Sequence, residues 1–212
     1  MTYFMAALIL LLSYLVGSFP SGYLIGRFNG IDIRKYGSKN IGATNVRRVL
    51  GRDWSIVCFA LDFLKGLLPV LLIGKVIGVR CDVGPEYGAL IAGIGAICGH
   101  VFPVWLHFKG GKGVATSLGV VAGMAFLPLL LGGITWLIIF QLKRIVSLAS
   151  MGAVVVVTLS ATLFQLFHWH PTGWPCVILF AIISAIVILR HKDNIERLRK
   201  GTESVFKKPE KN

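Results

Sequence analysis

Long apolar runs alternate with short polar connections along this chain. A helix that crosses the roughly 30 Å hydrocarbon core of a bilayer needs about 20 mostly apolar residues. The runs approach or exceed that length, and they cover residues 3–25, 54–77, 87–106, 114–140, 147–167 and 174–189. The pattern therefore predicts an all-α, polytopic integral membrane protein, with residues 1–212 forming a single membrane-embedded domain.

The first apolar run contains a helix-breaking segment, Gly17-Ser18-Phe19-Pro20-Ser21-Gly22. Proline lacks an N–H donor and clashes with the preceding turn, so we expect a kinked or broken helix near a membrane face. The start of the chain has no basic leader and no small-residue cleavage site, and its first positive charge is Arg27. We therefore expect residues 3–25 to remain as a span and not to be removed as a signal peptide.

Positive charge gathers in the connections between the apolar runs. The chain has 22 Lys and Arg against 9 Asp and Glu, which gives a formal net charge of +13, and seven of the basic residues lie between Arg27 and Asp53. Short connections rich in Lys and Arg stay in the cytoplasm, so this one is expected inside and the N-terminus outside. Charge concentrated in this way fits membrane topology and an anionic ligand better than nucleic acid.

The number of spans depends on residues 114–140. If they form one span, Lys143, Arg144 and the eight basic residues between Arg190 and Lys211 all lie outside, against the positive-inside rule. A tight helical hairpin that turns near residues 125–129, with Pro128 at the bend, makes every strongly basic connection cytoplasmic. We therefore expect about seven transmembrane helices, with the N-terminus outside, the C-terminus cytoplasmic, and two short members that are tilted or shielded by neighbours.

A first polar cluster occupies residues 37–48. Its candidate ligand groups are the side chains of Ser38, Asn40, Thr44, Asn45 and Arg48. A guanidinium fork suits phosphate, and hydroxyl and amide groups can complete a phosphate site. Thr44 is expected to cap a short helix in which Asn45 and Arg48 share a face. The alternative is a loop of turn-forming residues followed by a capped interfacial helix.

A second cluster occupies residues 99–113 and leads into a run that can be helical from Val114. It contains two histidines, two lysines and three loop glycines, namely His100, His107, Lys109, Lys112, Gly110, Gly111 and Gly113. Glycine lets backbone N–H groups approach an oxyanion, and a helix N-terminus adds donors and positive dipole. The spacing is not that of a Walker A loop. The alternative is a basic loop that only marks the cytoplasmic side.

A third cluster follows the last apolar run. His191 and Asn194 share a helix face, and a histidine at a membrane edge can donate to phosphate or to a developing oxyanion. The alternative is an ordinary surface segment. Asp62 and Lys65 lie three residues apart inside an apolar run, and we interpret them as a structural ion pair near the site.

Other chemistries have little support. The four cysteines form no CxxC pair, and His168 and His170 have no evident third ligand, so we expect neither a metal nor a cofactor. A Gly-x-Ser-x-Gly elbow is missing, which argues against a serine hydrolase. No histidine has the His-x4-Asp spacing of common acyltransferases that use acyl-CoA.

Residues 17–23, 37–45, 99–113 and 191–195 resemble, in order, the signature segments of the bacterial acyl-phosphate:glycerol-3-phosphate acyltransferase family. The resemblance implies a seven-helix enzyme of the bacterial cytoplasmic membrane with its active site on the cytoplasmic side. Such enzymes transfer a fatty acyl group from acyl phosphate to the 1-hydroxyl of glycerol 3-phosphate. The products are lysophosphatidic acid and inorganic phosphate, in the first step of phospholipid synthesis.

We expect direct acyl transfer, because no activated serine or cysteine is visible. The expected catalytic residues are Ser38, Arg48, His191 and Asn194. The expected substrate-binding residues are Asn40, Thr44, Asn45, Lys109, Gly110, Gly111, Lys112 and Gly113, and the resemblance favours the glycine-rich segment for glycerol 3-phosphate. Beyond the two substrates and membrane lipid, no protein partner is evident. A transporter of an organic phosphate is the main alternative, and a membrane scaffold is a weaker one.

Overall fold

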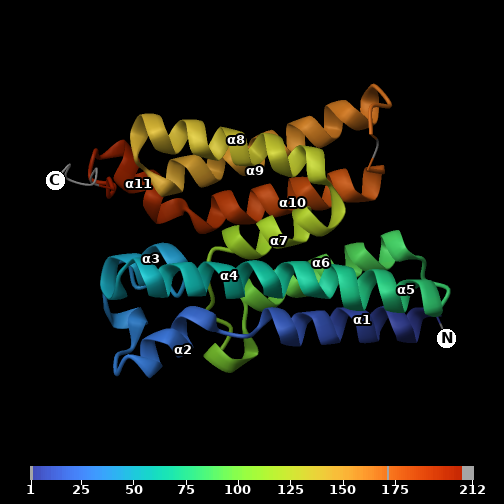
Figure 1. Cartoon of the computed structure of the whole chain (residues 1–212), viewed down its shortest axis with the longest axis horizontal. Coiled ribbons are helices and arrows are strands. Elements are labelled where there is room, and N and C mark those ends of the chain that lie inside the picture. Colours follow the sequence, from blue (N-terminus) through green and yellow to red (C-terminus); the bar gives the residue numbers. More distant parts are fainter. Residues whose placement is uncertain (1, 171, 207–212) are drawn as a thin grey trace. The chain divides into compact units, whose positions relative to one another are not determined.

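The computed structural model describes residues 2–170 and 172–206, and every regular element in these ranges is a helix. Its first compact unit, residues 1–124, contains α1 (Thr2–Gly17), α2 (Ser21–Phe28), η1 (Ile33–Lys35), α3 (Ala43–Leu50), α4 (Arg52–Leu68), the π-helix η2 (Pro69–Lys75), α5 (Val76–Arg80), α6 (Pro85–Val101), η3 (Val104–Leu106) and α7 (Val114–Met124) (Figure 1). The second unit, residues 125–212, contains α8 (Phe126–Lys143), α9 (Val146–Leu166), α10 (Trp174–Arg190) and α11 (Lys192–Arg199).

Five of the described helical segments are long and apolar enough to cross a membrane: residues 2–28, 52–80, 85–106, 126–143 and 146–166. A sixth is possible if α10 and α11, which meet at a bend of 57°, form one span. The eleven residues of α7 are fewer than a complete crossing needs. The expected helical membrane architecture is confirmed, while the count of seven spans stays a prediction. Lys207, Lys208 and Lys211 of the basic tail, and Pro171, lie outside the described residues.

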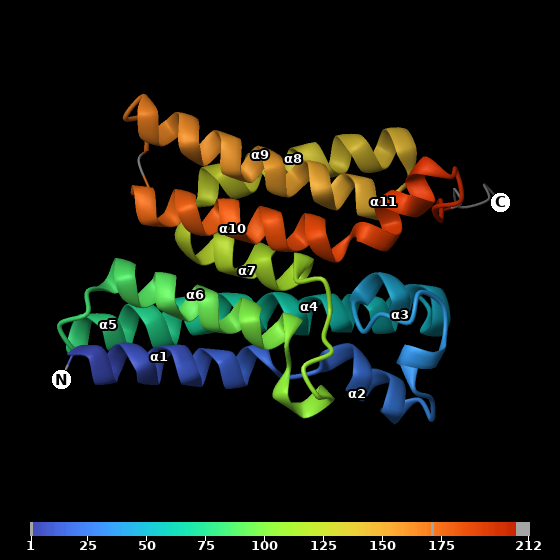
Figure 2. The ribbon, with the colours of Figure 1, turned by 180° about the vertical axis from the view of Figure 1, so that it is seen from behind.

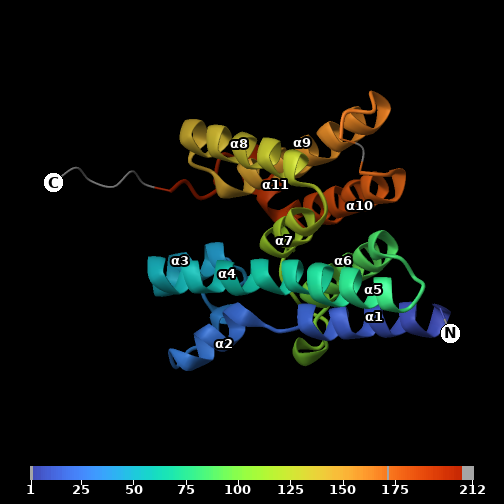
Figure 3. The same ribbon diagram turned by 45° about the vertical axis from the view of Figure 1, so that its right-hand side comes forward.

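The first span is broken where Pro20 predicted a break. Helix α1 ends at Gly17 and α2 begins at Ser21, directly after the proline (Figure 3). Gly17 lies so close to the backbone of Ala96 in α6 that a Cβ at this position would overlap it. The glycine therefore allows α1 and α6 to pack with their backbones in near contact, as small residues do in membrane proteins.

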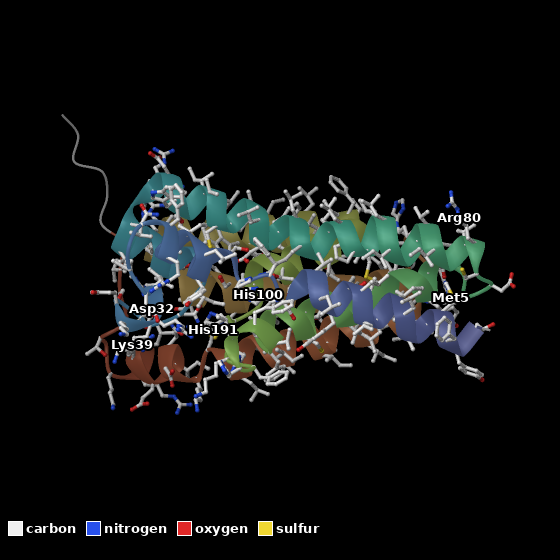
Figure 4. All side chains as sticks on the ribbon, turned by 90° about the horizontal axis from the view of Figure 1, so that it is seen from below. Met5, Asp32, Lys39, Arg80, His100 and His191 are labelled. Carbon is white, nitrogen blue, oxygen red and sulfur yellow. The ribbon has the colours of Figure 1, made fainter. Side chains whose placement is uncertain are left out.

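Within the first unit, the connection between α2 and α3 and the turn after α5 lie at opposite ends of the helices (Figure 4). Met5 and Arg80 lie at one end, Asp32 and Lys39 lie at the other, and His100 lies between them inside the unit (Figure 4). Helix α6 runs back from the Arg80 end, so the loop that follows it passes the junction of α1 and α2 (Figure 2). This fold brings the 102–113 loop away from the Arg80 end and toward the polar connection.

In the second unit, α9 packs against both α8 and α10. The indole N–H of Trp136 donates to the hydroxyl of Ser150 at 3.3 Å, and the hydroxyls of Thr158 and Ser184 lie 2.8 Å apart. Such side-chain hydrogen bonds satisfy polar groups between helices that face an apolar surround.

The helix break inside residues 114–140 falls at Ala125, which is extended with φ −148° and ψ 94°. This confirms a break at the start of the expected 125–129 segment. Pro128 does not form the bend, however, because it lies in the first turn of α8. Proline is tolerated there, since the first N–H groups of a helix have no partner within the helix.

Candidate functional site

The connection between α2 and α3 is organised by the side chain of Asn45, which is 1% exposed. Its Oδ1 accepts the backbone N–H of Ser38 at 2.7 Å. Its Nδ2 lies 2.8–3.3 Å from the backbone carbonyls of Ile33, Tyr36 and Asn40. The donors and the acceptor of the amide thus all bind the backbone of this loop. Asn45 holds the loop in shape, which differs from the substrate contact expected for it.

Helix α3 begins without the cap that the sequence suggested. Gly42 occupies the N-cap position, with φ −80° and ψ 162°, and Thr44 already lies inside the first turn. The side chain of Asn40 accepts the N–H of Gly42 at 2.8 Å, so it closes the turn just before the helix. The prediction that Thr44 caps this helix is therefore wrong, because the N-cap lies two residues earlier, at Gly42.

Ser38 and Arg48 are both exposed, on the loop and on α3 respectively. Thr44 and Arg48 are four residues apart and lie on one side of α3, whereas the side chain of Asn45 points into the unit. The segment therefore presents two hydroxyls and a guanidinium around a loop that a buried amide fixes from beneath.

The glycine-rich loop, residues 109–113, is held against the end of α6. The N–H of Gly110 donates to the carbonyl of Val101, and the N–H of Gly111 donates to the carbonyl of His100, both at 3.1 Å. A Cβ at Gly110 would overlap that His100 carbonyl, and one at Gly111 would overlap the imidazole ring. Both N–H groups bind protein carbonyls in this structure, and the expected role of Gly110 and Gly111 in binding substrate stays a prediction. Here the glycines allow close packing.

At position 113, glycine is required by the backbone conformation and not by close packing. Its φ is +85°, a conformation that other residues rarely adopt, and it directly precedes α7. The first turn of a helix directs backbone N–H groups and the positive end of the dipole toward its N-terminal side. Lys109 is exposed and Lys112 is half-buried on this loop. The lysines and the start of α7 thus form the basic part of the segment.

His191 lies at the 57° bend between α10 and α11 and is 4% exposed. Its Nδ1 is 2.7 Å from the carbonyl oxygen of Val187, one turn earlier in α10. Because a carbonyl only accepts, Nδ1 carries the hydrogen of this bond. The bond fixes the ring orientation and places a hydrogen on Nδ1.

Asn194 is fixed by a carboxylate that sequence reasoning did not select, Glu203. Oε1 of Glu203 accepts the Nδ2 of Asn194 at 2.6 Å and the hydroxyl of Ser147 at 2.8 Å, while Oε2 accepts the Nε of Arg197 at 2.7 Å. Burial raises the pKa of Glu203, but the three hydrogen bonds and the Arg197 charge outweigh it and hold the pKa below its usual value. The cluster joins α11 to the start of α9.

The structure gathers the sequence candidates into three groups. The first unit holds two of them: Ser38, Asn40, Thr44, Asn45 and Arg48 before and within α3, and Lys109, Gly110, Gly111, Lys112 and Gly113 between α6 and α7. The second unit holds His191 and Asn194. Among the described residues, no group of three His, Cys, Asp or Glu side chains is placed to hold a metal ion. The expected ion pair is confirmed, with Lys65 Nζ 2.7 Å from Asp62 Oδ1.

Comparisons with known proteins cover nearly the whole chain. A family model described as Glycerol-3-phosphate acyltransferase matches residues 7–201. A relative of that name from Aquifex aeolicus (strain VF5) is 42% identical over 203 residues, covering 95% of this chain and 99% of the relative. One from Synechococcus elongatus is 46% identical over 200 residues, covering 92% of this chain and 91% of the relative.

Two solved structures are also similar to this chain. Both are crystal structures of PlsY (YgiH), an integral membrane glycerol 3-phosphate acyltransferase, and both are 38% identical in sequence. The glycerol 3-phosphate form has a TM-score of 0.82 and covers 95% of this chain and 96% of PlsY. The lysophosphatidic acid form has a TM-score of 0.79 and covers 95% of each chain.

Proposed function

Because the chain belongs to the glycerol-3-phosphate acyltransferase family, we propose that acyl phosphate is the donor from which it transfers a fatty acyl group to the 1-hydroxyl of glycerol 3-phosphate. The protein is an integral membrane acyltransferase. The observation that carries the proposal is its similarity, over 95% of the chain, to an enzyme solved with glycerol 3-phosphate and with lysophosphatidic acid. These two molecules differ by one acyl group.

The proposed reaction is direct transfer. The 1-hydroxyl oxygen attacks the acyl carbonyl carbon, a C–O bond forms, and the bond from that carbon to the phosphate oxygen breaks. The phosphate leaves and one of its oxygens takes the hydroxyl proton, so the products are lysophosphatidic acid and inorganic phosphate. Acyl phosphate is an activated mixed anhydride, and positioning with charge stabilisation is therefore sufficient to accelerate the step.

The first unit supplies the phosphate-binding groups in this proposal. Arg48, with its planar fork, and the hydroxyls of Ser38 and Thr44 bind one phosphate. Lys109 and Lys112, together with the N-terminal turn of α7, bind the phosphate of glycerol 3-phosphate. Asn40 and Asn45 fix the loop before α3 through their side-chain hydrogen bonds. Gly110, Gly111 and Gly113 allow the loop between α6 and α7 to adopt its shape.

The second unit supplies His191 and Asn194, which orient the acceptor hydroxyl and the reacting carbonyl. Two observations support this assignment. The bond from His191 Nδ1 to Val187 sets the ring tautomer, and the bond from Asn194 to Glu203 sets the amide orientation. Both side chains are nearly buried, so their positions are defined by the protein and are not averaged by solvent.

We further propose seven spans, with the N-terminus outside and the C-terminus in the cytoplasm of a bacterial cell. The polar clusters then lie on the cytoplasmic side of the inner membrane, and both units belong to one membrane domain that acts without an obligatory protein partner. The placement of Asp32 and Lys39 at the opposite end of the first unit from Arg80 supports this topology (Figure 4).

The proposed donor is tested by supplying the purified protein with glycerol 3-phosphate and either acyl phosphate or acyl-CoA of the same chain length. We expect lysophosphatidic acid from acyl phosphate only. Product from acyl-CoA at an equal rate would overturn the donor assignment. Direct transfer is tested by leaving out glycerol 3-phosphate, and an acylated protein trapped under that condition would contradict it.

A further inference from the structure

A buried ionic network lies in the first unit beneath the glycine-rich loop. On α4, Lys65 Nζ is 2.7 Å from Asp62 Oδ1, and the two residues are only 5% and 2% exposed. Lys65 also donates to the carbonyl of Phe19 at 2.7 Å, and the hydroxyl of Ser21 donates to Asp62 Oδ1 at 2.9 Å. Phe19 and Ser21 flank the proline at the break between α1 and α2. The pair thus ties α4 to the broken first span.

The same carboxylate faces the end of α6. Nδ1 of His100 is 3.8 Å from Asp62 Oδ1, and the histidine is 3% exposed (Figure 4). His100 is also the residue against which the glycine-rich loop packs: its carbonyl accepts the N–H of Gly111, and its ring occupies the space in front of that glycine. Asp62 therefore lies next to the group that holds the N-terminal side of the loop.

The same part of α4 also contacts the other side of the loop. Gly66 directly follows Lys65, and a Cβ at Gly66 would overlap the backbone carbonyl of Thr116 in the first turn of α7. One turn of α4, residues 62–66, consequently touches the element before the loop through His100 and the element after it through Thr116. The contacts of α4 with His100 and with Thr116 therefore set the positions of the two ends of the loop.

Tying α4 to the broken first span does not by itself require a pair of charges at this place. Burying two ions carries a large desolvation penalty, and well-packed apolar side chains of similar volume often give equal or greater stability. Ionisable residues inside a membrane segment are costly and generally serve function. We propose that Asp62 and Lys65 are positioning residues, which act through His100 to hold the 109–113 loop in the geometry that binds glycerol 3-phosphate. This inference rests on the proposed function and extends it.

The test removes both charges together, in Asp62→Asn/Lys65→Met. Removing one charge would leave the other buried and unpaired, whereas removing both avoids that penalty. We expect the variant to fold and insert, with the KM for glycerol 3-phosphate raised about tenfold and the KM for the acyl donor unchanged. The matched control is Glu196→Gln/Lys200→Met, which removes the exposed ion pair of α11 and is expected to leave both constants unchanged.

A second arm asks whether the pair acts through His100. His100→Gln alone is expected to raise the KM for glycerol 3-phosphate by a similar factor, and to add little in the Asp62→Asn/Lys65→Met background. A folded Asp62→Asn/Lys65→Met variant with the wild-type KM for glycerol 3-phosphate overturns the proposal. The proposal is also overturned if adding His100→Gln to that variant raises the KM by the same factor as it does in the wild type, because the pair and His100 would then act independently. If the double variant does not fold, His100→Gln decides alone, because an unchanged KM there removes the route from the pair to the loop.

Direct titration of glycerol 3-phosphate without donor separates this inference from the proposed function. Wild-type protein that binds glycerol 3-phosphate but does not use acyl phosphate would overturn the proposed donor, and the comparison of binding between variants would still test the positioning role. Equal affinities of wild type and folded double variant contradict the positioning role even if turnover is observed.

Discussion

At the scale of single residues, Asn45 and Ser38 are neighbours in the structure with different expected roles. Asn45→Ala would remove the acceptor of the Ser38 N–H and the side-chain donor shared by three loop carbonyls. A loss of such buried hydrogen bonds costs about 2–3 kcal/mol of stability. Thermal unfolding in detergent should show this loss for Asn45→Ala, while Ser38→Ala keeps its stability and loses turnover. Wild-type stability in Asn45→Ala with a raised KM would restore the ligand role to Asn45.

A second prediction concerns alanine substitutions at Gly111 and Gly113. A Cβ at Gly111 meets the His100 ring, whereas a Cβ at Gly113 has Val101 Cγ2 no closer than 3.5 Å and is disfavoured by its φ of +85°. The left-handed conformation costs a non-glycine residue about 1–2 kcal/mol. Alanine at either position is expected to raise the KM for glycerol 3-phosphate without blocking insertion, with the larger effect at Gly111. Wild-type KM values in both inserted variants would reduce the loop to a structural role.

The sequence identified the polar residues of the candidate site, but it identified few of the groups with which they form hydrogen bonds or ion pairs. Asp62 and Lys65 are three apart, so helical periodicity alone pairs them. Ser147 and Glu203 hydrogen-bond across 56 positions, and His100 and Asp62 meet from different helices. No local pattern specifies such contacts. A buried ionisable residue in an apolar run does indicate that a partner exists, but it does not identify the partner, so the contact of Asp62 with His100 was not predicted.

At the scale of elements, α11 is held by Glu203 through Asn194, Arg197 and Ser147. The pKa of Glu203 is lowered in the folded protein, so the ionised form stabilises this docking. The contribution is complete above the unfolded pKa of about 4.3 and disappears as the pH falls through the lower folded value. Glu203→Gln removes it at every pH.

Hydrogen exchange of α11 measures this contribution. At pH 7 the exchange should be faster in Glu203→Gln than in wild type, and the difference should shrink as the pH falls below about 4.3. The exposed pair Glu196 and Lys200 provides the control, because Glu196→Gln should change α11 exchange little. Equal exchange in wild type and Glu203→Gln at pH 7 would contradict the docking role.

Helix boundaries followed the sequence where backbone chemistry decides them. Pro20 and the glycines around it predicted the break between α1 and α2, and the break near Ala125 was also expected. The start of α3 was misplaced because Gly42 takes the N-cap position in place of Thr44, after a turn that the Asn40 side chain closes. The bend at His191 was not foreseen, since residues 190–198 carry a pattern that a straight helix satisfies equally well.

At the scale of the whole molecule, the topology can be tested by labelling single cysteines in a background without the four natural ones. Lys39→Cys, Asp82→Cys and Lys143→Cys all replace exposed residues. With seven spans, a membrane-impermeant reagent added outside the cell should label only position 82. Labelling at position 143 from outside would indicate six spans, because residues 114–140 would then cross the membrane once.

Apolar runs were sufficient to predict a helical membrane protein, since a bilayer leaves few other ways to satisfy the backbone. They were not sufficient to predict the first unit's interior. The contacts of Gly17 with Ala96 and of Gly66 with Thr116 depend on which helix faces meet, and one sequence does not specify those pairings. For the same reason the two compact units were not anticipated. The expectation of a single domain remains a prediction.

We propose that this membrane protein transfers an acyl group from acyl phosphate to glycerol 3-phosphate. The most direct measurement follows both products of the purified protein in lipid, with Arg48→Ala as the control. We predict equal amounts of lysophosphatidic acid and inorganic phosphate from wild type, and a rate reduced at least about 100-fold in folded Arg48→Ala. Phosphate release without lysophosphatidic acid, or no release by a folded wild-type sample, would overturn the proposed acyl transfer.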